Sequence, residues 1–183
     1  MAVILGLAAD DVRALCMEAA TLAPGSVVEA VNFNEPTQIV IAGHNAGVER
    51  ACELAKAKGA KRAMKLAVSA PFHSSLLKPA SDRLREYMQD LAFAAPQIDL
   101  INNVDVAILN DPAQIKDALV RQAAGAVRWV ETMQKLADGG ITLVIESAPS
   151  KVLIGMAKRI DARLVGEALV DQASLDRVLS TLR

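Results

Sequence analysis

The first 68 residues constrain the fold most, because the spacing of their apolar residues changes in a defined order. Short apolar runs of strand length alternate with stretches in which apolar residues recur at helical spacing. The expected strands cover residues 2–7, 27–31, 38–42 and 62–68. The first expected helix follows a cap at Asp10 or Asp11 and runs to about residue 22, and the second covers residues 46–58. The resulting order, β-α-β-β-α-β, is that of two helices on one face of a four-stranded antiparallel sheet.

Local signals support this order. Asp10 and Asp11 are natural caps for the first helix, and Pro24 with Gly25 ends it. Residues 32–36, N-F-N-E-P, are rich in turn formers and suit an antiparallel hairpin between the second and third strands. We therefore predict a ferredoxin-like (βαββαβ) small subdomain over residues 1–68.

A different pattern begins after Val68. The expected helices cover residues 76–91, 115–122, 129–137 and 174–182, and the expected strands cover residues 98–103, 141–145 and a short segment from 164. Helices that alternate with short buried strands indicate a parallel sheet covered on both faces. We predict a second domain over residues 69–183 and assign the chain to the α/β class.

Composition narrows the class of function. The chain is 52% hydrophobic but only 3% aromatic, so its core must consist of Ala, Val, Leu and Ile. A net charge of -1 argues against a nucleic-acid partner, whose phosphates demand an excess of Lys and Arg. Cys16 and Cys52 form no CxxC motif, so we expect reduced, buried thiols and no metal site. No apolar run reaches the ~18 residues that span a membrane, and we expect a cytoplasmic protein with no membrane association.

Only a few residues are suited to polar chemistry. His73 follows the end of an expected strand, in a loop where Ser74 and Ser75 could bond its ring. On position alone, a catalytic base and a satisfied or exposed ring both remain open. His44 lies in the run G-H-N-A-G, which has the spacing of a nucleophile elbow but an asparagine where the nucleophile would stand. We interpret that run as a turn and helix cap.

The amino-acid sequence around these residues resembles that of one family, and the resemblance continues in register along essentially the whole chain. Residues 31–44 read V-N-F-N-E-P-T-Q-I-V-I-A-G-H, residues 59–63 read G-A-K-R-A, and residues 69–80 read S-A-P-F-H-S-S-L-L-K-P-A. N-N-V-D at 102–105, L-V-R-Q at 119–122 and V-R-W at 127–129 continue the match. The family is that of malonyl-CoA:acyl carrier protein transacylases.

The resemblance implies a hydrolase-like acyltransferase domain, of which this chain would be the C-terminal part, with the ferredoxin-like subdomain inserted in it. It implies transfer of malonyl from coenzyme A to acyl carrier protein, in fatty acid or polyketide biosynthesis, through a Ser-His dyad. His73 would be the base, and the backbone carbonyl of Gln122 would orient its ring. Phe72, Asn32 and Asn34 would contact the substrate. No cofactor or metal is implied; coenzyme A thioester is the substrate, and phosphopantetheine is the acceptor.

This chain also departs from the family pattern. It has no G-H-S-x-G elbow, so we expect the serine nucleophile to be absent and the chain to be catalytically incomplete by itself. Ala148 and Ser150 replace two family glycines, and a proline before V-R-W is missing, so we expect a strained loop and a looser one. The alternatives are an inactive fragment or a non-catalytic module that binds acyl carrier protein. A run of basic residues motivates the latter: Lys56, Lys58, Lys61, Arg62 and Lys65.

Overall fold

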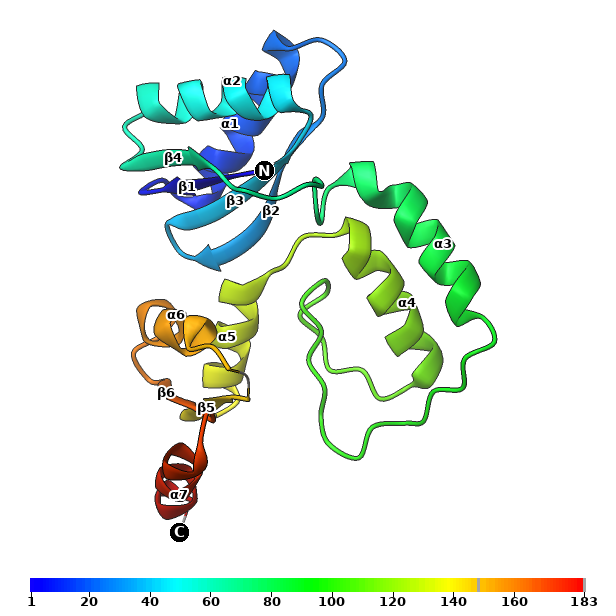
Figure 1. The fold of residues 1–183 in the computed structure, drawn as a ribbon, viewed down its shortest axis with the longest axis vertical. Coiled ribbons are helices and arrows are strands. Elements are labelled where there is room, and N and C mark those ends of the chain that lie inside the picture. The colour runs from blue at the N-terminus through cyan, green and yellow to red at the C-terminus, as the bar shows by residue number, and fades with distance from the viewer. Residues whose placement is uncertain (148, 183) are drawn as a thin grey trace. The chain divides into compact units, whose positions relative to one another are not determined.

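A four-stranded antiparallel sheet organises the N-terminal part of the chain in the computed structural model, which describes residues 1–147 and 149–182 (Figure 1). Its strands are β1 (Ala2–Leu5), β2 (Val28–Glu35), β3 (Gln38–Gly43) and β4 (Arg62–Lys65). They lie in the order β2-β3-β1-β4, and every neighbouring pair is antiparallel. β2 and β4 are therefore the edge strands.

Two helices cover one face of this sheet. α1 (Ala9–Leu22) and α2 (Asn45–Ala57) pack against each other and lie on the same side of the strands in Figure 1. Because side chains alternate along a strand, Ile39 and Ile41 of β3 face the helices. Val40 belongs to a smaller apolar cluster on the other face. The main core consists of Ala2, Ile4, Val12, Leu15, Cys16, Ala19, Val28, Phe33, Ile39, Ile41, Val48, Ala51, Cys52 and Ala55.

The hairpin differs from the sequence prediction. β2 continues to Glu35, so residues 32–35 are strand, and only Pro36 and Thr37 form the turn. Two register shifts between β2 and β3 accommodate the extra residues as bulges. The predicted aspartate cap is also wrong. Ala8 is the N-cap of α1, and Asp10 forms an ion pair with Arg13 instead.

Two further helices pack together beyond the sheet. A 3-10 turn, η1 (Ser75–Leu77), leads directly into α3 (Lys78–Met88), which packs against α4 (Pro112–Ala124). The buried hydroxyl of Ser81 on α3 donates to the Val120 carbonyl of α4 at 2.6 Å. The strand predicted over residues 98–103 is not formed, and Ile101 makes only an isolated bridge with Ile108.

The chain divides into two compact units, Met1–Trp129 and Val130–Arg183. The domain boundary predicted after Val68 lies inside the first unit and stays a prediction. From Trp129 onward the chain forms α5 (Trp129–Asp138), β5 (Leu143–Glu146), α6 (Val152–Ile160), β6 (Val165–Ala168) and α7 (Gln172–Thr181).

The second unit contains a pair of parallel strands. β5 and β6 pair from Leu143 with Val165 to Glu146 with Ala168, and α6 packs against both. Ile145 is 36% exposed and Val165 is 57% exposed. In the described residues, the predicted covering of both sheet faces is therefore not found. None of the described helices combines the length and hydropathy that crossing a bilayer requires.

Candidate active site

His73 lies in the loop between β4 and η1, and its half-buried ring contacts the end of α4. Its Nδ1 is 3.0 Å from the backbone carbonyl oxygen of Gln122, which is the contact that the family resemblance implies. A carbonyl oxygen can only accept, so Nδ1 must carry the hydrogen. The neutral ring then has its free lone pair on Nε2. A ring held in this way is suited to accept a proton at Nε2.

The backbone of His73 is in the left-handed region, with φ at 63°. A non-glycine residue there costs about 1–3 kcal/mol and persists only where surrounding contacts hold it. Ser74 is fully buried and supplies one set of contacts. Its hydroxyl donates to the Pro71 carbonyl at 2.7 Å, and its N–H donates to the same oxygen at 3.3 Å. These bonds close the loop around His73.

Ser75 connects the same loop to the sheet. Its N–H and its hydroxyl donate to the two carboxylate oxygens of Glu29 on β2, each at 2.7 Å. The hydroxyls of Ser74 and Ser75 are thus directed to Pro71 and Glu29 rather than to the His73 ring. No pattern in the sequence points to Glu29, which lies 46 residues before Ser75.

Gln122 contributes its side chain as well as its carbonyl. The amide nitrogen donates to the carbonyls of Gly125 at 3.0 Å and Ala126 at 3.2 Å. Gly125 is required here, because a Cβ would lie 2.7 Å from the Arg121 carbonyl oxygen and 2.9 Å from Val104 Cγ2. These contacts lie in the loop that lacks the family proline, and its expected looseness stays a prediction.

The segment after Gly125 returns to the sheet. Val127 donates its N–H to the Val31 carbonyl at 2.8 Å and accepts from the Phe33 N–H at 2.9 Å. This is a parallel bridge to Asn32 on the open edge of β2. The strand that carries Glu29 therefore also anchors the chain five residues after Gln122.

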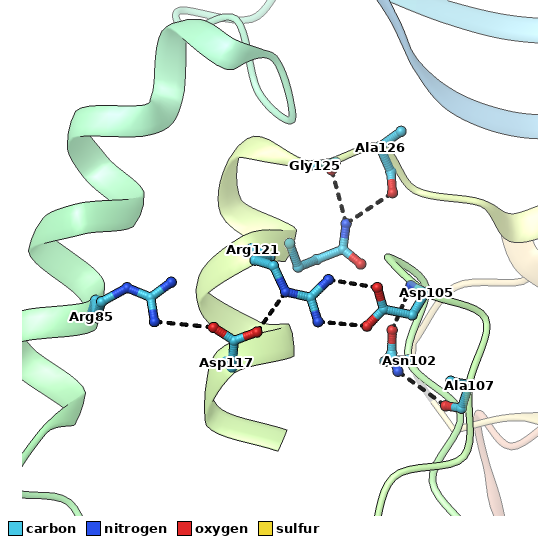
Figure 2. Close-up of polar contacts among 9 residues, drawn as sticks. Arg85, Asn102, Asp105, Ala107, Asp117, Arg121, Gly125 and Ala126 are labelled. Atoms are coloured by element: carbon cyan, nitrogen blue, oxygen red, sulfur yellow. Dashed lines mark hydrogen bonds and ion pairs between the residues drawn. The ribbon is translucent and has the colours of Figure 1, made fainter. Parts of the chain in front are cut away.

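An ionic network surrounds the last turns of α4 (Figure 2). Arg121 forms a bidentate pair with Asp105, at 2.5 and 2.7 Å, and its Nε donates to Asp117 at 2.6 Å. Arg85 of α3 reaches Asp117 at 3.0 Å. The hydrogen bond from Arg121 is the main cause that lowers the pKa of Asp105, and Arg121 followed by Arg85 lowers the pKa of Asp117. Both carboxylates therefore stay ionised, and the pairs link α4 to α3 and to the loop that contains Asp105.

The predicted substrate residues occupy mixed positions. Phe72 precedes His73 and is 44% exposed. Asn32 and Asn34 are half-buried on β2. In the described part of the chain, neither asparagine side chain forms a hydrogen bond with His73 or Gln122. Their roles in substrate binding stay predictions, as do the catalytic roles of His73 and Gln122.

The second histidine has a structural contact. His44 Nδ1 accepts the Val27 N–H at 2.9 Å, and the His44 N–H donates to the Val27 carbonyl at 2.9 Å. His44 also precedes α2 as its N-cap residue. The interpretation of this run as a turn and helix cap agrees with that position.

The basic run is partly neutralised. Lys58 pairs with Glu18 at 3.2 Å, and Lys65 pairs with Glu49.

The cysteines are free and buried, and burial raises the pKa of Cys16 to about 12. In residues 1–147 and 149–182, no three His, Cys, Asp or Glu side chains are grouped so that they could hold a metal ion.

The loop with the replaced glycines lies in the second unit. Ser150 donates its hydroxyl to Glu146 at 2.6 Å, and Glu146 also accepts the N–H groups of Leu153 and Ile154 at the start of α6. These bonds, that of Ser150 first, lower the pKa of Glu146. Ser150 is not one of the two non-glycine residues with positive φ in the described chain, so no strain arises there. Ala148 lies outside the described residues.

Comparison with known proteins gives a consistent set of relatives. A malonyl CoA-acyl carrier protein transacylase from Salmonella typhimurium is 44% identical over 180 residues, which are 98% of this chain and 57% of that protein. The crystal structure of an acyl-carrier-protein S-malonyltransferase from Burkholderia pseudomallei is 62% identical with a TM-score of 0.94, again over 98% of this chain and 57% of the other. A malonyl-transacylase solved in complex with a type II PKS acyl carrier protein is 43% identical with a TM-score of 0.94, over the same shares. No protein-family model matches the chain.

The resemblance predicted from the sequence is therefore confirmed. The chain is homologous to malonyl CoA-acyl carrier protein transacylases along nearly its whole length. It spans about 57% of the length of the relatives it matches.

Proposed function

We propose that this chain, homologous over its length to malonyl CoA-acyl carrier protein transacylases, supplies the general base of such an enzyme. The single observation that carries the proposal is the 3.0 Å contact between His73 Nδ1 and the Gln122 carbonyl. It leaves Nε2 as the basic atom of a half-buried ring in a loop. The chain would act with a serine nucleophile supplied by the part of the protein that corresponds to the remaining length of the relatives.

The chemistry follows from the position of the free lone pair. A serine hydroxyl is a poor nucleophile until a base removes its proton. In the first half-reaction, His73 Nε2 takes that proton as the serine oxygen bonds to the malonyl carbonyl carbon of the coenzyme A thioester. The C–S bond then breaks, and the imidazolium returns its proton to the coenzyme A thiolate. In the second half-reaction, the phosphopantetheine thiol of acyl carrier protein loses its proton to the same Nε2 as its sulfur bonds to the carbonyl carbon of the malonyl-serine ester. The ester C–O bond to serine then breaks, and the imidazolium returns its proton to the serine oxygen, which restores the hydroxyl and leaves malonyl on the carrier protein as a thioester.

The Gln122 carbonyl has a defined part in this cycle. It accepts the Nδ1–H of the neutral ring and of the imidazolium, and it favours the ring orientation and the charged intermediate state. The same tasks fall to a carboxylate in a Ser-His-Asp triad. A carbonyl is a weaker partner for a cation but needs no ionisation of its own.

The remaining assignments complete the proposal. Phe72, beside the base, would limit the space for branched acyl groups, and Asn32 and Asn34 would face the substrate. Acyl carrier protein and malonyl-CoA would be the partners, with no metal and no cofactor beyond the thioester and phosphopantetheine groups. The relative solved with an acyl carrier protein supports this choice of partner.

We extend the proposal to the fold. The antiparallel order β2-β3-β1-β4, with α1 and α2 on one face, supports a ferredoxin-like subdomain over residues 1–68. Residues 69–183 would then belong to the hydrolase-like acyltransferase domain. The boundary after Val68 separates the βαββαβ pattern from the segment that contains His73. It differs from the division into compact units, which lies after Trp129.

A chimera tests the function directly. This chain would replace the matching segment of the Burkholderia pseudomallei malonyltransferase, to which it is 62% identical. We expect the chimera to transfer radiolabelled malonyl from coenzyme A to acyl carrier protein. His73→Gln should lower kcat/KM by about 10²–10⁴-fold, the usual contribution of a general base.

The other histidine provides the matched control. His44→Gln makes the same chemical change at the N-cap of α2, and we expect transfer within about threefold of the parent chimera. The 183-residue chain alone should form no hydroxylamine-labile malonyl adduct. Equal loss from both glutamine variants, or an adduct on the chain alone, would contradict the proposal.

A second candidate function is a non-catalytic module that binds acyl carrier protein. The exposed basic residues Lys56, Lys61 and Arg62 favour it, because acyl carrier proteins are acidic. The ion pairs of Lys58 and Lys65 weaken it. Charge reversal of Arg62 and Lys65 should abolish carrier binding by the chain alone if this candidate is correct. Unchanged binding would eliminate it.

A further inference from the structure

We infer that Glu29 is a positioning residue for His73 and acts through Ser75. The inference rests on the proposed role of His73 as the base, and it adds a residue that neither the motif nor the dyad chemistry contains. Glu29 does not touch the imidazole. Its carboxylate fixes the backbone two residues further along the same loop.

The Glu29 contact is a two-point clamp. Each carboxylate oxygen accepts a separate hydrogen from Ser75 at 2.7 Å, one from the N–H and one from the hydroxyl. Hydrogen bonds to an ionised acceptor are about twice as strong as neutral ones, and two of them fix an orientation as well as a distance. Glu29 itself lies on a firmly held part of β2, since the neighbouring Val28 is 5% exposed and paired with Gly43 of β3.

The loop needs such a restraint because His73 holds a left-handed backbone conformation. The bonds between Ser74 and Pro71 shape the loop internally but do not fix its place against α4. Among the described residues, two sets of hydrogen bonds join residues 71–75 to distant parts of the chain: those of Ser75 with Glu29, and that of His73 with the Gln122 carbonyl. The second of these is the contact whose geometry matters for proton transfer.

Both partners in the contact between His73 and the Gln122 carbonyl are tied to β2. Glu29 holds the His73 loop, while Val31 and Phe33 hold Val127, five residues after Gln122. The histidine and its orienting carbonyl are therefore each tied to the same strand within five positions of one another. Removing the carboxylate of Glu29 releases the His73 loop from β2 and leaves the segment after Gln122 attached to it. Misplacement of a base by about 1 Å can cost on the order of 10²-fold in rate.

The first test uses the ring nitrogens of the chain itself, so it does not depend on activity. The chain contains two histidines, and His44 serves as the internal reference. Long-range ¹H–¹⁵N spectra of Glu29→Ala, Glu29→Gln and Ser75→Ala report the tautomer of each ring. We expect His73 to change from the Nδ1–H form to a mixture of tautomers in Glu29→Ala, less so in Ser75→Ala, which keeps the Ser75 N–H bond. The His44 signals should stay unchanged in all three.

A control variant separates positioning from general stability. Glu53→Gln removes an exposed carboxylate that pairs with Arg50 within α2 at 2.8 Å. It should leave both histidine tautomers as they are. A purely structural role for Glu29 would lower the melting temperature without altering the His73 tautomer. That result in a folded Glu29→Ala variant, or an unchanged tautomer in Ser75→Ala if Glu29→Ala does not fold, overturns the inference.

The second test measures kinetics in the chimera. Glu29→Ala should lower kcat by about 10- to 100-fold with KM within about twofold, and Glu53→Gln should leave both constants unchanged. A rise in KM at constant kcat would assign Glu29 to substrate binding and contradict the inference. If the unsubstituted chimera transfers no malonyl group, the proposed function fails, and the spectra still decide whether Glu29 positions His73.

Discussion

At the scale of single residues, the two histidines differ in the hydrogen-bond partner of their Nδ1 atoms. His73 faces an acceptor, the Gln122 carbonyl, whereas His44 faces a donor, the Val27 N–H. An imidazole nitrogen must carry a hydrogen in the first case and must lack one in the second. The sequence distinguishes these rings only by the motifs around them, because their partners lie 49 and 17 residues away.

This difference gives a prediction for the unsubstituted chain. When both rings are neutral, His73 should be the Nδ1–H tautomer and His44 the Nε2–H tautomer. Long-range ¹H–¹⁵N correlation spectra distinguish the two forms from the nitrogen shifts. His73→Gln and His44→Gln assign each set of signals. The same tautomer on both rings would contradict the contacts that the two Nδ1 atoms make.

A second prediction at this scale concerns acid stability. Hydrogen bonds from the Arg163 side chain, followed by its N–H, lower the pKa of Asp161 from 3.8 to about 2. The folded chain thus binds this proton less readily than the unfolded chain does. The pair contributes stability above pH 3.8 that is lost as the pH falls towards about 2. The free energy of unfolding of Asp161→Asn, measured against pH, should fall less steeply in this window than that of the parent chain. Parallel curves would contradict the prediction.

At the scale of elements, close backbone approach matters more than helix propensity. Gly125 lies where α4 meets the returning chain, and a Cβ there would approach the Arg121 carbonyl to 2.7 Å. Gly155 lies inside α6, and apart from its chain neighbours and its own helix backbone, no described atom would lie within 4 Å of a Cβ added to it. Both are glycines beside apolar residues in the sequence, which offers no hint that they differ.

Alanine at these two glycines should therefore have opposite effects. Gly125→Ala should lower the free energy of unfolding by about 1–3 kcal/mol, because the added methyl overlaps backbone atoms. Gly155→Ala should raise it by about 0.5–1 kcal/mol, since alanine is the better helix former. Urea denaturation followed by circular dichroism measures both. A destabilised Gly155→Ala would show that α6 has a neighbour at that position.

The same scale shows what the sequence can and cannot predict. Periodicity predicts α1 and α5 closely, because each buries one regular face, and the apolar run of β3 predicts that strand closely, because it is buried on both faces. It fails for residues 32–35, where turn-forming asparagines lie in a bulged strand, and for residues 98–103, whose apolar run does not form a strand. His73 and Gln122 were predicted through family motifs. Glu29 was not, because a bond over 46 residues leaves no trace in local spacing.

At the scale of the whole molecule, much apolar surface is open. Ile98 is 81% exposed and Tyr87 is 73% exposed, and Val152 in the second unit is 63% exposed. Single exposed apolar side chains are ordinary, whereas contiguous apolar patches mark surfaces that another polypeptide covers, and we predict that the exposed side chains of each unit belong to such patches. The chain spans about 57% of its relatives' length, which supplies a candidate for that polypeptide.

This surface leads to a prediction about assembly. Alone, the chain should bind a hydrophobic dye and self-associate in sedimentation experiments. The segment of the Burkholderia pseudomallei malonyltransferase that this chain does not cover should form a one-to-one complex with it, reduce dye binding and restore malonyl transfer. His73→Gln should assemble equally well but transfer at least about 10²-fold more slowly, because assembly should depend on the apolar surface and transfer on the proposed base. A monomeric chain that binds neither dye nor segment would show that its apolar side chains need no cover.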